Sequence, residues 1–169
     1  MKRIFTLISI IILSFVGCNV YAQKNNTEND YNLKKAYEIL NEENDEAKAL
    51  DIVNKQLRET PDNVYALVLR ARILRRKEEY GQALQDINHA LKVNKPKKTE
   101  CPNSTLYWWK GYIYQDMYDM DNTVLALKTA YELARKDNKD NLQSIAFDYA
   151  QALHYEEDYA LPLMSSTAI

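Results

Sequence analysis

Apolar side chains in the segment Tyr80–Leu91 recur at the spacing of one face of an α-helix. The stripe i, i+3, i+4, i+7, i+10 and i+11 is occupied by Tyr80, Ala83, Leu84, Ile87, Ala90 and Leu91. Small residues on this stripe allow a neighbouring helix to approach closely, and the larger residues fill the space beside them. The segment therefore predicts an amphipathic helix that packs against another helix.

The same stripe occurs at two other places in the chain. Earlier in the chain, its six positions are occupied by Glu46, Ala49, Leu50, Val53, Gln56 and Leu57. Later in the chain, after a slightly longer interval, they are occupied by Met120, Thr123, Val124, Leu127, Ala130 and Tyr131. A helix that recurs at a nearly fixed spacing is typical of stacked helical hairpins. We therefore expect an all-α fold, a right-handed α-solenoid of three to four hairpins.

Helix-breaking residues divide this pattern into segments. The run Thr60–Asn63 contains a proline, which cannot continue a helix, and an asparagine that can cap the next one. The run Val93–Ser104 holds two prolines and predicts an irregular loop. After residue 22 the chain has few glycines, which argues against a β-rich fold. The expected helices span residues 31–40, 46–58, 64–76, 80–91, 105–117, 122–136 and 141–155, with another starting at Ala160.

Small and apolar residues recur at matching places in four units, residues 30–63, 64–97, 104–137 and an incomplete 143–169. In the second unit they are Ala71, Leu74, Ala83, Ile87 and Ala90. In the third they are Gly111, Tyr114, Thr123, Leu127 and Ala130. In the first they are Tyr37, Leu40, Ala49, Val53 and Pro61. In the fourth they are Ala150, Leu153 and Tyr159, with the charged Asp158 before the tyrosine.

This arrangement resembles the tetratricopeptide repeat (TPR) family, whose units are helix–turn–helix hairpins of about 34 residues. The chain departs from the family pattern at one place in every unit, because Ala36, Arg70, Lys110 and Tyr149 stand where leucine is usual. Thr123 and Pro162 also replace a small alanine of the second helix. The resemblance implies a repeat domain over residues 30–169 that acts by binding other proteins.

The first 22 residues predict a signal peptide. Lys2 and Arg3 precede an apolar run from Ile4 to Val16, and Ala22 ends a cleavage site of the small-x-small type. Soluble export to a bacterial periplasm is the expected outcome. The alternatives are an outer-membrane lipoprotein, lipidated at Cys18, and a membrane anchor that is retained. Residues 23–29 predict a polar linker.

The charge and the motif content of the sequence indicate a binding scaffold without catalytic activity. The formal net charge of −2 gives no general attraction for nucleic acid. No catalytic constellation, metal-ligand spacing or cofactor motif is present in the sequence, so we expect no enzyme activity, metal or cofactor. Removal of the leader would leave Cys101 as a lone loop thiol.

In TPR proteins one face of each first helix lines a concave groove, and the resemblance implies such a groove here. The expected partner-binding residues are Tyr65, Arg72, Arg75, Arg76, Trp108, Tyr112, Gln115, Phe147, Gln151, His154 and Tyr155. Aromatic and guanidinium groups are frequent anchors of protein interfaces. The alternative is that the rings pack between helices and that the arginines form a solvated face.

Three functions remain open at this point. The first is a protein- or peptide-binding scaffold in the bacterial cell envelope. The second is a glycan-binding surface protein that uses the aromatic residues Trp108–Tyr112. The third is the helical part of a larger enzyme or sensor. The segment after Ala160 predicts a short helix with no capping helix behind it, so a homodimer through this edge is a further expectation.

Overall fold

The computed structural model describes the backbone of residues 27–95, 101–137 and 141–165. Side chains are described for residues 31–95, 101–136 and 141–155. In these ranges every regular element is helical. The elements in chain order are α2 (Thr27–Glu38), the π-helical turn η1 (Ile39–Glu43), α3 (Glu46–Glu59), α4 (Val64–Arg76), α5 (Tyr80–Val93), α6 (Asn103–Asp116), α7 (Met120–Asp137) and α8 (Leu142–Ser165).

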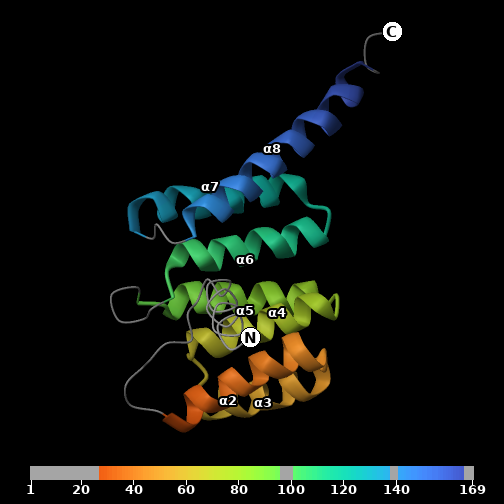
Figure 1. Cartoon of the computed structure of the whole chain (residues 1–169). Coiled ribbons are helices and arrows are strands. Elements are labelled where there is room, and N and C mark those ends of the chain that lie inside the picture. The colour runs from red at the N-terminus through yellow and green to blue at the C-terminus, as the bar shows by residue number, and fades with distance from the viewer. Residues whose placement is uncertain (1–26, 96–100, 138–140, 166–169) are drawn as a thin grey trace, which may run out of the picture.

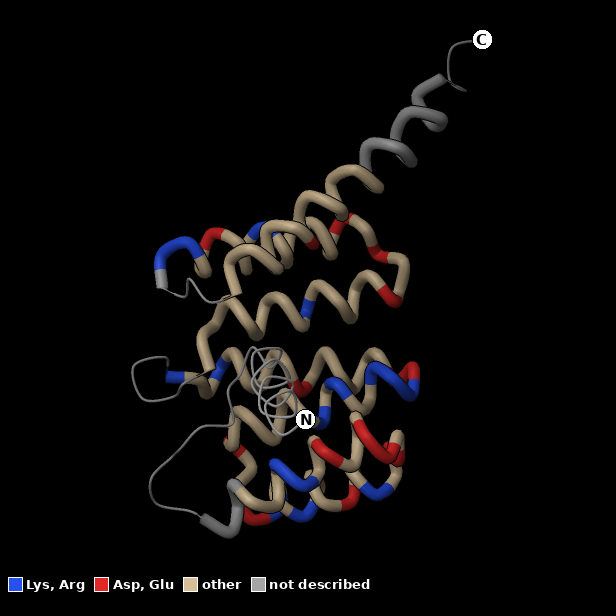
Figure 2. The backbone as a smooth tube through the Cα atoms, in the orientation of Figure 1, with Lys and Arg blue, Asp and Glu red and all other residues tan. Residues whose placement is uncertain are grey.

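The helices form antiparallel pairs that stack in layers (Figure 1). The pair α2/α3 lies at one end, α4/α5 and α6/α7 follow, and α8 packs against α7 at the other end. The all-α array of adjacent hairpins is thereby confirmed. Charges of both signs follow α2 and α3, whereas α6 and the described part of α8 carry few (Figure 2).

Local residues set the helix boundaries as the sequence indicates. The Asp45 side chain accepts a hydrogen bond from the backbone nitrogen of Lys48 at 2.9 Å and caps α3. The Asn63 side chain accepts from the nitrogen of Ala66 at 3.1 Å and caps α4. Because each cap satisfies a helix-terminal donor, it fixes where the next hairpin element begins.

The repeat spacing is also visible in the turns inside the hairpins. Asn44, Glu78 and Tyr118 have left-handed backbone conformations, with φ of 54°, 61° and 60°. They follow one another at the same intervals as the apolar stripes. The three turns are therefore equivalent positions of one repeated hairpin.

The apolar stripes form the core. Ala83, Ile87 and Ala90 of α5 are fully buried, as are Ala49 and Val53 at the equivalent positions of α3. One continuous cluster runs from α2 to α6, and a second joins α7 to α8. Burial of these faces is the main stabilising contribution in a fold of this type.

Two polar residues on the stripes are buried without loss of hydrogen bonds. The Thr123 hydroxyl donates to the carbonyl of Asp119 at 2.7 Å, which explains how threonine replaces the usual alanine. Gln56 donates from Nε2 to the Thr60 hydroxyl at 2.7 Å. A buried polar group that keeps a partner avoids most of the cost of leaving water.

Arg70, which stands where the TPR pattern has leucine, forms a two-pronged ion pair with Asp86 of α5. Its Nε and Nη2 each donate to one Asp86 carboxylate oxygen at 2.7 Å. Its Nη1 donates to Asn54 Oδ1 of α3 at 3.1 Å. The arginine thus joins three helices, and the departure from the family pattern has a structural role.

Both ends of the array differ from the expectation. α2 begins at Thr27, inside the predicted linker, and it continues through η1 to Glu43 where a turn was expected. The separate helix predicted from Ala160 is wrong, because α8 is continuous from Leu142 to Ser165. The segment Glu156–Tyr159 lacks glycine and proline, so nothing in it ends a helix, and Pro162 falls within the last turn. The C-terminal part of α8 projects away from the stack (Figure 1).

Cys101 is in a different state in the full chain from the one predicted for the chain after removal of the leader. Cys101 is a loop residue, as expected, but it is fully buried and its sulfur is disulfide-bonded. Its partner sulfur lies outside the described residues. The sequence holds one other cysteine, Cys18, inside the predicted leader, so a lone Cys101 thiol stays a prediction for the chain without that leader.

Candidate functional site

An open pocket of about 470 Å³ lies between α6 and α8, on the face predicted to line the groove. Four aromatic rings and several polar groups surround it. The lining residues are Trp108, Trp109, Tyr112, Asn141, Gln143, Ser144, Phe147 and Asp148. Its size falls in the range of pockets that enclose a small ligand or one large side chain.

Asp148 of α8 holds two rings of α6 in place. Trp108 Nε1 donates to Asp148 Oδ2 at 2.7 Å, and the Tyr112 hydroxyl donates to the same oxygen at 2.5 Å. Trp108 and Tyr112 are one helical turn apart, with ring centroids 5.6 Å from each other. The carboxylate therefore fixes one wall of the pocket before any ligand binds.

The pKa of Tyr112 is raised above its ordinary value. Burial of the ring is the largest cause, and the hydrogen bond to Asp148 and the negative charge of that carboxylate add to it. Arg75 opposes the shift only in part. Tyr112 is therefore a neutral hydrogen-bond donor to Asp148 at physiological pH.

Two arginines of α4 stack on the rings next to the pocket. The guanidinium carbon of Arg72 lies 5.1 Å from the ring centroid of Tyr37 and 4.7 Å from that of Trp109. The guanidinium carbon of Arg75 lies 5.8 Å from the Trp109 centroid and 5.5 Å from that of Tyr112. Cation–π contacts of this kind hold α4 against α6.

The charges of these arginines are partly compensated within the chain. Arg75 Nη1 lies 3.3 Å from Asp116 Oδ2, so this guanidinium also forms an ion pair. The pKa of Arg72 is lowered, and burial is the largest cause. The interaction with the neighbouring Tyr37 partly offsets this lowering. Both guanidinium groups therefore lie against aromatic rings and are not fully solvated, unlike the arginine face that we kept as the alternative.

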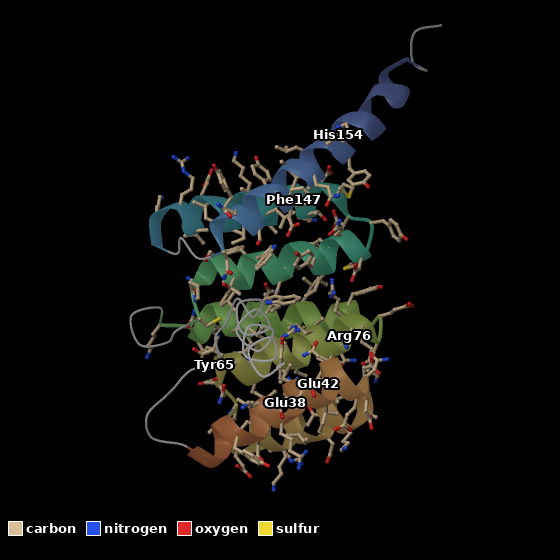
Figure 3. The ribbon with its side chains drawn as sticks, viewed as in Figure 1. Glu38, Glu42, Tyr65, Arg76, Phe147 and His154 are labelled. Atoms are coloured by element: carbon tan, nitrogen blue, oxygen red, sulfur yellow. The ribbon has the colours of Figure 1, made fainter. Side chains whose placement is uncertain are left out.

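Arg76 acts elsewhere, at the junction of α4 with the first hairpin. Its Nη1 donates to the carbonyl of Leu40 at 2.7 Å, and its Nη2 donates to Asn41 Oδ1 at 3.2 Å. Figure 3 labels Arg76 and Tyr65 towards opposite ends of α4. Tyr65 packs against the hydrophobic core. Neither Arg76 nor Tyr65 lines the pocket between α6 and α8.

The other predicted residues lie along the outer face of α8 or beside the pocket. Phe147 lines the pocket and is 68% exposed, and Figure 3 shows it on α8. Gln151, His154 and Tyr155 are exposed further along the same helix, and Gln115 on α6 is half-buried. Of the predicted contact residues, the structure brings Trp108, Tyr112 and Phe147 together at the pocket.

Two central residues, Trp109 and Asp148, were not among the predicted groove residues, although Trp109 lies in the aromatic run Trp108–Tyr112 that we considered for glycan binding. Trp109 lies outside the helical positions that line the groove in TPR proteins, so the repeat register gave no reason to select it. Asp148 lies far from Tyr112 in the chain, and one sequence carries no signal for that pairing.

Other kinds of site find little support in the described residues. Among them, no group of three or more His, Cys, Asp and Glu side chains could hold a metal ion. No helix in the described ranges combines the length and the apolar character that a membrane span requires.

Comparison with known proteins corrects the expected location. A family model for ChAPs, the Chs5p-Arf1p-binding proteins, matches residues 23–168. These are eukaryotic adaptor proteins of the cytosol and Golgi and have no catalytic activity. The prediction of a bacterial periplasmic protein is therefore wrong, and its outer-membrane lipoprotein alternative fails with it. The leader and Cys18, on which it rested, lie outside the described residues.

No curated protein matches the chain. The family match covers residues 23–168, all of the described helices, and family members carry TPR-like helical repeats. The array of adjacent hairpins agrees with such repeats. On this evidence, the chain belongs to the ChAPs family of Chs5p-Arf1p-binding proteins.

Proposed function

We propose that this chain is a non-enzymatic adaptor that holds a segment of a protein partner in the groove formed by α4, α6 and α8. The pocket between α6 and α8 is the centre of this groove. The observation that carries the proposal is the pair of hydrogen bonds from Trp108 and Tyr112 to Asp148. They orient the rings in the unbound protein, and preorganisation of this kind lowers the entropy cost of binding.

The composition of the pocket supports a protein ligand. Aromatic rings that are held rigidly are common hot spots, because they bury much area with few rotatable bonds. Phe147 is largely exposed at the edge of the pocket, where a partner can cover it. The family supports a protein partner rather than the sugar-binding alternative.

The family name gives the first partners to test. Its members are described as binding Chs5p and Arf1p, and we infer that this chain binds a protein of one of these two kinds. The part of the partner that enters the groove would be an extended or helical segment, since an array of hairpins offers a long concave surface.

The test compares two exposed apolar side chains on neighbouring helices. Phe147→Ala removes the pocket residue of α8, and Leu125→Ala removes a residue of α7 that is 61% exposed and does not line the pocket. We expect Phe147→Ala to weaken binding of the partner by about tenfold or more, as for a hot-spot residue. Leu125→Ala should leave the dissociation constant unchanged. Equal effects of the two substitutions in calorimetric titrations would contradict a binding role for this groove.

A further inference from the structure

We propose that the pocket between α6 and α8 binds the ammonium group of a lysine side chain presented by the partner. This inference rests on the proposed function and adds the chemistry of the contact. It depends on three features of the pocket: its aromatic walls, the charge of Asp148 and the arrangement of oxygen acceptors.

The aromatic walls offer ring faces to a cation. Of the four pocket rings, Trp109 and Tyr112 already contact Arg72 and Arg75. Trp108 and Phe147 have no cation contact within the described part of the chain. An ammonium group near the face of such a ring is stabilised by the ring quadrupole, most strongly for tryptophan.

Asp148 brings a negative charge that the described residues do not pair with a cation. Both of its hydrogen bonds come from neutral donors, the Trp108 indole and the Tyr112 hydroxyl. No lysine, arginine or histidine in the described ranges forms an ion pair with it. The carboxylate is half-buried, so a ligand cation would gain a charge partner in a partly desolvated site.

The acceptors favour an ammonium over a guanidinium group. Both hydrogen bonds to Asp148 end on Oδ2, which leaves Oδ1 as the oxygen for a ligand. A guanidinium binds a carboxylate best through two parallel hydrogen bonds, one to each oxygen. An ammonium needs one oxygen from the carboxylate, and Gln143 and Ser144, which line the same pocket, bring further side-chain oxygens to it.

The arginines of α4 do not oppose this assignment strongly. Arg75, which stacks on Tyr112, is itself paired with Asp116 at 3.3 Å. Arg72 lies between Tyr37 and Trp109. Neither forms an ion pair with Asp148, so the carboxylate charge stays available to a ligand.

The experiment titrates the whole protein with three small probes and follows the indole N–H signal of Trp108 by NMR. The probes are n-butylammonium, n-butylguanidinium and n-butanol, which share the alkyl chain and differ in the head group. We expect n-butylammonium to bind about fivefold more tightly than n-butanol, and n-butylguanidinium to bind more weakly than n-butylammonium. Equal binding of n-butylammonium and n-butanol would overturn the proposal.

A charge variant tests the role of Asp148. Asp148→Asn keeps an oxygen acceptor for Trp108 and Tyr112 but removes the charge, and the preference for n-butylammonium over n-butanol should disappear. Asp51→Asn, an equal charge change at an exposed position of α3, should keep the preference. Retention of the preference in Asp148→Asn would contradict the inference. So would tighter binding of tetramethylammonium than of n-butylammonium, because it would assign the pocket to quaternary ammonium groups.

The probes need no partner protein, so the two proposals can fail separately. If Phe147→Ala weakens partner binding while the probes show no preference for ammonium, the groove remains and the lysine contact is wrong. If the probes show the preference while Phe147→Ala leaves partner binding intact, the pocket binds cations but the partner docks elsewhere, which contradicts both the proposed function and the contact with a partner lysine.

Discussion

Gly111 lies at a close contact between α6 and α7. A Cβ atom built at Gly111 would lie 2.7 Å from Leu127 Cδ2 and 2.8 Å from Cγ, closer than real Cβ contacts allow. Leu127 is fully buried, so it has little room to move. The glycine is therefore required by packing, since its backbone conformation is one that other residues adopt.

We expect Gly111→Ala to destabilise the protein by about 1–3 kcal/mol, the usual cost of overpacking a core. Gly81→Ala is the matched control, because a Cβ there has no atom within 4 Å. It should be neutral or stabilise the protein by up to about 1 kcal/mol through helix propensity. Urea unfolding followed by circular dichroism measures both, and similar effects of the two substitutions would contradict close packing at Gly111.

Tyr112 should make stability depend on pH in the alkaline range. Unfolded tyrosine has a pKa near 10, whereas burial and the hydrogen bond to Asp148 raise the pKa of Tyr112 in the folded protein. Above about pH 10 the unfolded chain loses a proton that the folded chain keeps. The stability that the protonated Tyr112 hydroxyl contributes is therefore complete below that pH, and it is lost as the pH rises through the pKa of Tyr112 in the folded protein.

Urea unfolding between about pH 9 and pH 11 tests this expectation. The wild type should lose more unfolding free energy over the interval than Tyr112→Phe does. Tyr118→Phe, at a position 91% exposed, should follow the wild type. If the unfolding free energy of Tyr112→Phe falls with pH as steeply as that of the wild type, the folded state does not keep the Tyr112 hydroxyl protonated.

At the scale of the elements, the ion pair between Arg70 and Asp86 joins α4 to α5. Arg70→Leu restores the usual TPR residue but leaves the buried Asp86 carboxylate unpaired, which should cost about 3 kcal/mol. Adding Asp86→Ala, the residue type of the buried equivalent Ala126, should recover most of that loss. A double-mutant cycle by urea unfolding measures the coupling. No recovery in the double variant would show that the ion pair is not the cause.

The apolar spacing predicted most helices because buried stripes dominate hairpin packing. Ala83, Ile87 and Ala90 are buried as the spacing required. The helices at the ends of the array were harder to predict, since nothing in Glu156–Tyr159 requires either a turn or a helix. For the site, the repeat register selected Trp108, Tyr112 and Phe147, but the carboxylate that fixes their geometry comes from a long-range pairing that local pattern does not encode.

At the scale of the whole molecule, each hairpin is stabilised by its neighbours. Helices α4, α5 and α6 pack against helices of adjacent layers, whereas α8 packs mainly against α7 and reaches α6 through Asp148. We expect hydrogen exchange to be slowest in α4–α6 and fastest in α8. Protection of α8 equal to that of α5 in a proven monomer would contradict this gradient.

The pocket is built from two successive layers, with Trp108 and Tyr112 on α6 and Phe147 and Asp148 on α8. In repeat arrays each hairpin contacts only its neighbours, so the layers on either side can stack on a hairpin that is inserted between them. A hairpin inserted between these two layers would leave a foldable array but would separate the carboxylate from its rings. The proposed recognition of a partner therefore depends on the order of the repeats, whereas folding depends on each repeat's own pattern and on its contacts with its neighbours.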